Sequence, residues 1–323
     1  MIKDFQTYIN EGLFDRSQSE FIIKKTDKGI EQIYIPKTKA ALYDNIKRLI
    51  DEQGGTDHPN LNNIDISELH EPDCFDCLFG PARSGFNVCP DISSWKMNEE
   101  CSTVGMFYGN DVIKEFVVPE GITRLDEQFF RECPSLESVI IHDGISCIGN
   151  HAFQECKNLT SVVIHDTVTV IENGAFFQCE GLSSIKLPNS ITQIGEYTFW
   201  GCNHLEHINI PKGIRTITRS MFVFCSKLES IEIPDNIKGI DDHAFSCCGL
   251  KSIVIPNSVT YIEPYAFYEC FSLEHVDIPD SVGKIGDDAF SSCRKLKSIK
   301  IPYKCKIDGR IAPLPTVVTR RHP

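Results

Sequence analysis

The sequence predicts a repeat solenoid, in which similar coils stack side by side and their short strands pair into a parallel sheet. Three observations support this fold class. A phenylalanine recurs at a nearly constant interval from residue 130 onward, the residues between two phenylalanines repeat one apolar pattern, and a proline follows most of the apolar runs. With 323 residues, of which 41% are hydrophobic, the chain is long enough to bury a continuous core.

The phenylalanine column sets the period of the repeat. Its members are 23 residues apart, except for one interval of 22. They are Phe130, Phe153, Phe176, Phe199, Phe222, Phe245, Phe267 and Phe290. A cysteine stands three residues after each phenylalanine, and a leucine usually follows three residues later. At Gly249 one residue is missing, so Leu250 arrives early and the interval shortens.

Each unit combines two periodicities, as the unit at 228–245 shows. Residues 228–233 alternate apolar with polar side chains, which predicts a short strand, and Pro234 ends it because proline cannot donate to a ladder. Ile237, Ile240 and the Ala-Phe pair that follows predict a helical or 3₁₀ arc back to the next strand. We therefore expect parallel strands on the concave side of the solenoid and short helical or 3₁₀ arcs on its convex side.

The unit resembles the BspA-type leucine-rich repeat, and the resemblance covers about residues 107–302. The pattern is seen in one unit as Ile191, Ile194, Gly195, Phe199, Cys202, Leu205, Ile208, Ile210 and Pro211. Repeats of this class are typical of surface proteins of gut and oral bacteria and of some protists. The resemblance implies a leucine-rich-repeat fold that serves adhesion or protein binding and has no chemistry of its own.

The cysteine column is expected to be a buried structural ladder rather than a set of functional thiols. Leucine-rich repeats place either Asn or Cys in this slot, because a small polar group there can bond to the turning backbone. Here Asn110 stands 23 residues before the first cysteine and continues the column. The predicted ladder is Asn110, Cys133, Cys156, Cys179, Cys202, Cys225, Cys248, Cys270 and Cys293.

Residues 60–106 are expected to form degenerate coils of a second type, similar to the 26-residue repeats of bacterial surface proteins. The residues that carry this resemblance are Asp91, Ile92, Ser93, Trp95, Gly105, Met106, Phe107 and Tyr108. An earlier, weaker copy consists of Asp65, Ile66, Ser67, Leu78 and Phe79.

Residues 1–59 are expected to form a small α/β cap, and residues 303–323 a basic C-terminal tail. In the cap, Phe5, Ile9 and Leu13 mark an amphipathic stretch. A strand pair at 21–23 and 33–35 follows, and then a helix that starts after Thr38 and stops at Gly54. Such an end unit shields the first coil of a solenoid from solvent.

The charge and the apolar runs exclude two classes of partner. A formal net charge of −13 opposes binding to nucleic acid, which needs a basic surface. No apolar run approaches the roughly 18 residues that span a bilayer, so membrane insertion is not expected. The first residues lack the apolar stretch of a signal peptide, which predicts a cytoplasmic or phage-particle location, or a surface location by a non-Sec route. The segment 10–14 also resembles the leader of bacteriophage proteins.

The outward positions of the predicted strands are the candidate binding residues, because repeat proteins usually bind on the concave sheet. They are Ile140, Val163, Lys186, His207, Asn209, Glu232, Val254, His275, Asp277 and Lys300. An idle, solvated sheet would have a similar composition, since Tyr, Trp and Arg are missing. Ile140 and Val163 are the one local indication of a contact patch. Beside the core phenylalanines, Phe177, Trp200 and Phe224 are either packed between coils or form an adhesive stripe.

No pattern in the sequence predicts an enzyme. Cys74, Cys77, Cys89 and Cys101 are spaced so that they could hold zinc, form redox disulfides or remain free thiols. His207 and His275 are three repeats apart, too far to share a metal ion. We therefore expect a non-catalytic protein-binding or scaffolding protein without a cofactor or metal, whose partner is a protein. The alternative is a structural component of a larger assembly such as a bacteriophage particle.

Overall fold

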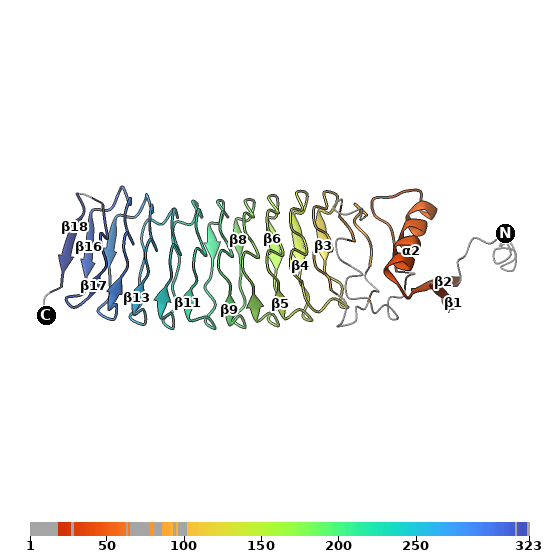
Figure 1. The fold of residues 1–323 in the computed structure, drawn as a ribbon, viewed down its shortest axis with the longest axis horizontal. Helices are drawn as coiled ribbons and strands as arrows, with labels where there is room; N and C mark the ends of the chain where they lie inside the picture. The colour runs from red at the N-terminus through yellow and green to blue at the C-terminus, as the bar shows by residue number, and fades with distance from the viewer. Residues whose placement is uncertain are drawn as a thin grey trace.

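The chain is a long stack of coils with a helix near its N-terminal end. The computed structural model describes residues 19–26, 29–62, 64, 78–80, 86–92, 95, 102–313 and 315–321. Figure 1 shows that the coils follow one another along a rod that is nearly straight in this view, with α2 toward one end and β18 at the other. Among the described residues, no helix is long and apolar enough to cross a bilayer.

The described part of the N-terminal region is a hairpin followed by one helix. β1 (Ser19–Thr26) and β2 (Gly29–Pro36) pair antiparallel. α2 (Lys39–Glu52) begins after Thr38, whose side-chain oxygen accepts the amide of Ala41 at 3.2 Å. The helix buries Leu42, Ile46 and Leu49 in the same apolar cluster that runs on into the coils. The positive φ of Gly54 marks its end.

One face of the rod, here called the first face, carries one short parallel strand from most coils. These strands are β3 (Glu115–Val117), β4 (Ser138–Ile140), β6 (Ser161–Val163), β8 (Ser184–Ile185), β10 (His207–Ile208), β14 (His275–Asp277), β16 (Ser298–Ile301) and β18 (Val317–Arg320). They form three separate sheets, ordered β3-β4-β6, β8-β10 and β14-β16-β18. In β3, β6 and β14 the middle residue is buried and its two neighbours are exposed, as the alternation of the sequence predicts.

A second face also carries one short parallel strand from most coils. Its strands are β5 (Cys147–Ile148), β7 (Val170–Ile171), β9 (Gln193–Ile194), β11 (Thr216–Ile217), β12 (Gly239–Ile240), β13 (Tyr261–Ile262), β15 (Lys284–Ile285) and β17 (Lys306–Ile307). They form sheets of three and five strands. In all but the last, the isoleucine of each strand points into the core and is buried.

This second strand corrects the expectation of helical or 3₁₀ arcs, because residues 102–313 contain neither kind of helix. The rest of each arc is a run of turns in which every fourth residue is left-handed, for example Gln128 (φ 61°) and Glu132 (φ 56°). Left-handed residues rotate alternate amides toward the next coil, so the N–H of Phe130 donates to the carbonyl of Ala152 at 2.7 Å. The N–H of Arg131 instead donates to Gln128 of its own coil. A helix would keep all of these bonds within one coil.

The core is a continuous column of stacked aromatic rings. From Phe107 to Phe290 the rings of the phenylalanine column follow one another with centroids 4.9 to 5.7 Å apart. Each of these rings between Phe130 and Phe290 is fully buried. The repeat thus holds one ring per coil at nearly the spacing of paired strands.

Residues 303–313 and 315–321 form one more coil of the stack. They contribute β17 to the second face and β18 to the first face. One guanidinium nitrogen of Arg320 donates to the carbonyls of Pro302, Tyr303 and Cys305 at 3.3, 2.8 and 3.1 Å. These three backbone acceptors are therefore satisfied by a side chain rather than by another strand.

Candidate binding face

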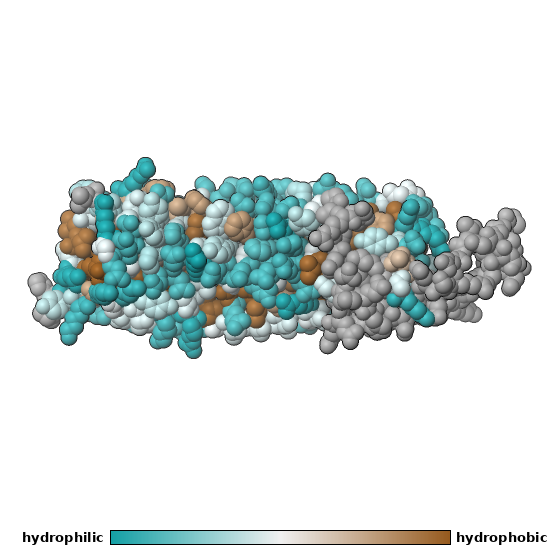
Figure 2. All heavy atoms as spheres, in the orientation of Figure 1, coloured by the Kyte–Doolittle hydropathy of each residue, from teal (hydrophilic) through white to brown (hydrophobic). Residues whose placement is uncertain are grey.

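All ten predicted binding residues lie on the first face and are exposed. They occupy the outward positions of its strands, or the equivalent positions in the two coils where no strand forms. On the side shown in Figure 2, the coloured surface is mostly hydrophilic, and hydrophobic atoms lie in small, separate patches. Exposed apolar residues on the first face are therefore of particular interest.

Three apolar side chains in adjacent coils form one such patch, here called the apolar strip. Val117, Ile140 and Val163 are directly paired across β3, β4 and β6. Their exposed fractions are 63%, 46% and 53%. Val117 was not among the predicted residues, although it lies one 23-residue period before Ile140, so the repeat spacing could have identified it.

The middle of the first face is hollowed, and four predicted residues line the first hollow. Lys186, His207, Asn209 and Glu232 surround a volume of about 430 Å³. There the strand ladder is interrupted, and the side-chain amide of Asn209 replaces a neighbouring backbone. It accepts the N–H of Leu187 at 2.8 Å and donates to its carbonyl at 2.7 Å.

A second hollow of about 620 Å³ lies between the two coils without a first-face strand. Glu232 and Val254 line it, and Val254 is the most exposed large apolar residue described, at 80%. Both hollows are open and shallow, without a buried polar group that would fix a small ligand. They suit a broad contact better than an enclosed substrate.

The remaining predicted residues lie near the C-terminal end, and two of them are engaged within the chain. His275 shares a hydrogen bond of 2.8 Å with the hydroxyl of Ser298. Asp277 forms an ion pair with Arg321. Lys300 lies next to Asp277 across β14 and β16. Among the described residues, no cluster of three or more potential ligands could hold a metal ion.

The ladder residues lie in the core and connect successive coils. Each of the eight cysteines is buried, and its thiol donates to the carbonyl of the core phenylalanine one coil earlier. The Cys156 thiol, for example, lies 2.9 Å from the carbonyl oxygen of Phe130. Asn110 holds the same place with two donated and two accepted bonds.

Burial makes these thiols poor nucleophiles. It raises the pKa of the Cys202 thiol to about 12 and also raises those of Cys179 and Cys248. Only the thiolate attacks electrophiles, so such groups are inert at neutral pH. Of the four cysteines considered for zinc or redox chemistry, only Cys89 lies among the described residues, and burial raises its pKa as well.

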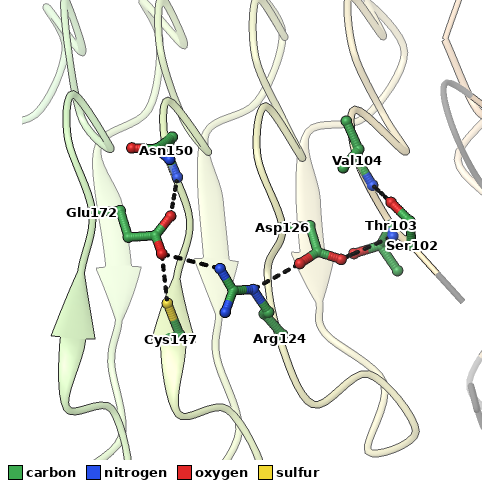
Figure 3. Close-up of polar contacts among 8 residues, drawn as sticks. All are labelled: Ser102, Thr103, Val104, Arg124, Asp126, Cys147, Asn150 and Glu172. Atoms are coloured by element: carbon green, nitrogen blue, oxygen red, sulfur yellow. Dashed lines mark hydrogen bonds and ion pairs between the residues drawn. The ribbon is translucent and has the colours of Figure 1, made fainter. Parts of the chain in front are cut away.

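A polar network not foreseen from the sequence crosses the second face (Figure 3). Arg124 lies between two carboxylates, 2.7 Å from Asp126 and 3.0 Å from Glu172, and so spans two coils. Glu172 also accepts hydrogen bonds from the thiol of Cys147 at 3.7 Å and from the backbone N–H of Asn150 at 2.9 Å. Burial and this carboxylate raise the pKa of Cys147 to about 11, which Arg124 partly opposes. Each charged group of the network thus has a partner of opposite charge.

The aromatic residues beside the core are mostly packed between coils. Phe177 and Trp200 stack with centroids 4.5 Å apart, and Phe224 packs edge-on against Trp200 at 5.2 Å. The indole therefore contacts a phenylalanine ring in each neighbouring coil. Phe224 remains 47% exposed. The edge is chiefly a packing feature rather than an open aromatic platform.

This arrangement of coils matches a known repeat family. The model of the BspA type leucine rich repeat region matches in six copies, over residues 82–160, 146–270 and 215–310. The chain belongs to the BspA-type leucine-rich-repeat family. The matched residues run from 82 to 310 and so include most of the described stack.

A solved structure of a bacterial protein resembles this BspA-type protein in fold. A leucine-rich repeat protein from Bacteroides ovatus is similar with a TM-score of 0.62 and 24% identity, over 92% of this chain and 67% of that one. A leucine rich cell surface protein from Faecalibacterium prausnitzii matches with a TM-score of 0.38 and 23% identity, over 76% and 69%. No curated protein matches the chain.

Proposed function

We propose that this chain is a non-catalytic protein that binds or scaffolds a partner protein through its first face. The observation that carries the proposal is the apolar strip of Val117, Ile140 and Val163, three exposed apolar side chains in adjacent coils of a hydrophilic surface. Membership of a repeat family whose proteins typically bind proteins supports it. The inert thiols and the self-satisfied network of the second face are consistent with it.

The strip can anchor a complex but cannot hold it alone. Burying three half-exposed branched side chains contributes roughly 2 to 4 kcal/mol. A micromolar complex needs about 8 kcal/mol. The partner therefore has to contact polar residues of the first face that border the strip as well.

The proposal is tested by comparing what the protein and its variants capture from the cells that produce it. The test variant carries Val117→Thr, Ile140→Thr and Val163→Thr, which remove apolar surface but keep the β-branched shape. Val254→Thr is the matched control, because Val254 occupies the same column outside the strip. Thermal melting confirms that all three proteins fold.

We expect at least one protein to be captured by the wild type and by Val254→Thr and to be depleted in the triple variant, as quantified by mass spectrometry. Identical captures by all three would contradict a first-face contact at the strip. Capture lost equally in the triple variant and in Val254→Thr would place the contact over the whole face instead.

The site of action is a separate question, on which adhesion and assembly make different predictions. Fractionation of the producing cells and of any phage particles that they release distinguishes them. Recovery in particles at fixed stoichiometry would support a structural role in a larger assembly. Recovery at the cell surface would support adhesion, and recovery in the cytoplasm would support intracellular scaffolding.

A further inference from the structure

The apolar strip is bordered by carboxylates on both sides. Within three residues along the chain lie five exposed acidic side chains and a single cation, Lys114. The acidic residues are Glu115, Glu120, Glu137, Asp143 and Asp166. Within the described part of the chain none of them pairs with lysine or arginine, and Asp143 has only His142 at 3.9 Å. An apolar centre within an acidic rim favours a partner that is apolar in the middle and basic at its edges.

The spacing of the strip favours a helix over a strand. Paired strands are about 4.8 Å apart, so the outer two residues of the strip, Val117 and Val163, are separated by about 10 Å along the rod. Apolar residues at i, i+3 and i+7 of a helix span about 10.5 Å, since the rise is about 1.5 Å per residue. Alternate residues of an extended segment, i, i+2 and i+4, span about 13 Å and fall out of step with the coils.

We propose that the apolar strip receives an amphipathic helix with lysine or arginine on both sides of its apolar ridge, lying along the axis of the rod. This inference rests on the proposed function and specifies the chemistry of the partner. The helix contacts the strip over about two turns. The apolar ridge of the helix ends beside Lys186, the first polar residue in the column after Val163. Lys186 repels a cation of the helix there.

Synthetic peptides test this chemistry directly on the whole chain. The first probe is a helical peptide of about 18 residues with leucine on one face and lysine on the others. A second peptide has glutamate in place of each lysine. A third alternates valine and lysine and so favours an extended form. Affinity is measured by fluorescence anisotropy for the wild type, the triple threonine variant and Val254→Thr.

We expect the lysine-leucine helix to bind the wild type and Val254→Thr alike, and the triple variant about tenfold more weakly. Replacement of Glu120, Asp143 and Asp166 by the matching amides weakens binding and reduces its salt dependence, because the rim charges are lost. The glutamate peptide binds none of the proteins.

Two results would overturn the inference. Equal affinity of the helical probe for the wild type and the triple variant would show that the strip is not its site. Tighter strip-dependent binding of the extended peptide would show that the occupant is a strand. In either case, a cell protein whose capture depends on the strip would leave the proposed function standing and exclude only the basic helix.

Discussion

Cys202 and its equivalents connect successive coils through one thiol hydrogen bond to the preceding core phenylalanine, whereas Asn110 makes four hydrogen bonds in the same place. The thiol of Cys202 donates to the carbonyl of Phe176 at 3.2 Å and is otherwise surrounded by apolar atoms. A thiol is a weak donor and packs as a small hydrophobic group. It therefore suits the closely repeated coils, whereas the amide suits the first coils, where four backbone groups need a partner.

Replacing Cys202 by leucine tests how tightly the ladder is packed. The side chain is fully buried between stacked coils, so the larger group has to displace its neighbours. We expect the free energy of unfolding to fall by about 1 to 3 kcal/mol, as measured by urea denaturation. Cys247→Leu, at a partly exposed position, is the control and should cost less. A neutral result at Cys202 would mean that the column has free space.

The raised thiol pKa values make stability depend on pH in the alkaline range. The pKa of Cys202 is raised by burial from 9.0 to about 12. Below pH 9 the thiol is protonated in both states and contributes no slope. Between pH 9 and 12 the unfolded thiol ionises while the folded one stays protonated, so the free energy of unfolding falls.

The slope from one such thiol is at most about 1.4 kcal/mol per pH unit. We expect the slope measured by urea denaturation from pH 9 to 10.5 to be smaller in Cys202→Ala by up to this amount. Lysine and tyrosine titrations are common to both proteins and cancel in the comparison. Equal slopes in the wild type and in Cys202→Ala would show that the Cys202 thiol ionises in the folded protein as readily as in the unfolded chain.

At the scale of the element, the strands of the first face could be predicted but the arcs could not. Alternation in 228–233 and its equivalents indicated inward and outward residues correctly even where no regular strand forms. The spacing of Ile237, Ile240 and Phe245 is compatible with a helix. What prevents a helix is the left-handed backbone at every fourth residue, and those positions hold residues such as Gln, Glu, His, Tyr and Ser more often than Gly. They have no sequence signature.

The left-handed positions predict stabilising substitutions. Ser292 has φ 59°, a conformation that costs a non-glycine residue roughly 1 kcal/mol. Ser292→Gly should therefore raise the free energy of unfolding by about 0.5 to 1 kcal/mol. The matched control is Ser272→Gly in the turn of the preceding coil, where φ is not positive and the unfolded chain gains freedom. A loss of stability at both positions would mean that the strain at Ser292 is already relieved.

The part of the candidate site that follows the 23-residue period could be predicted from the sequence. The column from Ile140 to Lys300 was placed on one exposed face, and the same spacing leads back to Val117. The hollows form where the first-face strand ladder between coils is interrupted, at 228–233 and 250–255. These two segments lie on either side of the shortened turn at Gly249. Strand separation is a property of the stacked backbone, so no single residue indicates it.

At the scale of the whole molecule, a coil is stable only against its neighbours. One unit of 23 residues buries too little apolar surface to offset the conformational entropy that it loses. The two ends of the stack therefore need protection. The inward residue of each first-face strand is mostly buried, yet Val318 in β18 is 44% exposed. Arg320 compensates in part by bonding the carbonyls of the final turn.

Removal of residues 303–323 should therefore destabilise the stack from its C-terminal end. The truncation exposes Ile299 and Ile301, now buried, and leaves β16 as an open edge. We expect a lower melting temperature and concentration-dependent self-association in size-exclusion chromatography. Arg320→Gln removes only the bonds to three carbonyls and should cost about 1 kcal/mol without self-association. Lys304→Gln, an exposed charge change in the same coil, should be neutral. A truncated protein that stays monomeric and melts like the full chain would show that the last coil is an appendage and that β16 alone can end the solenoid.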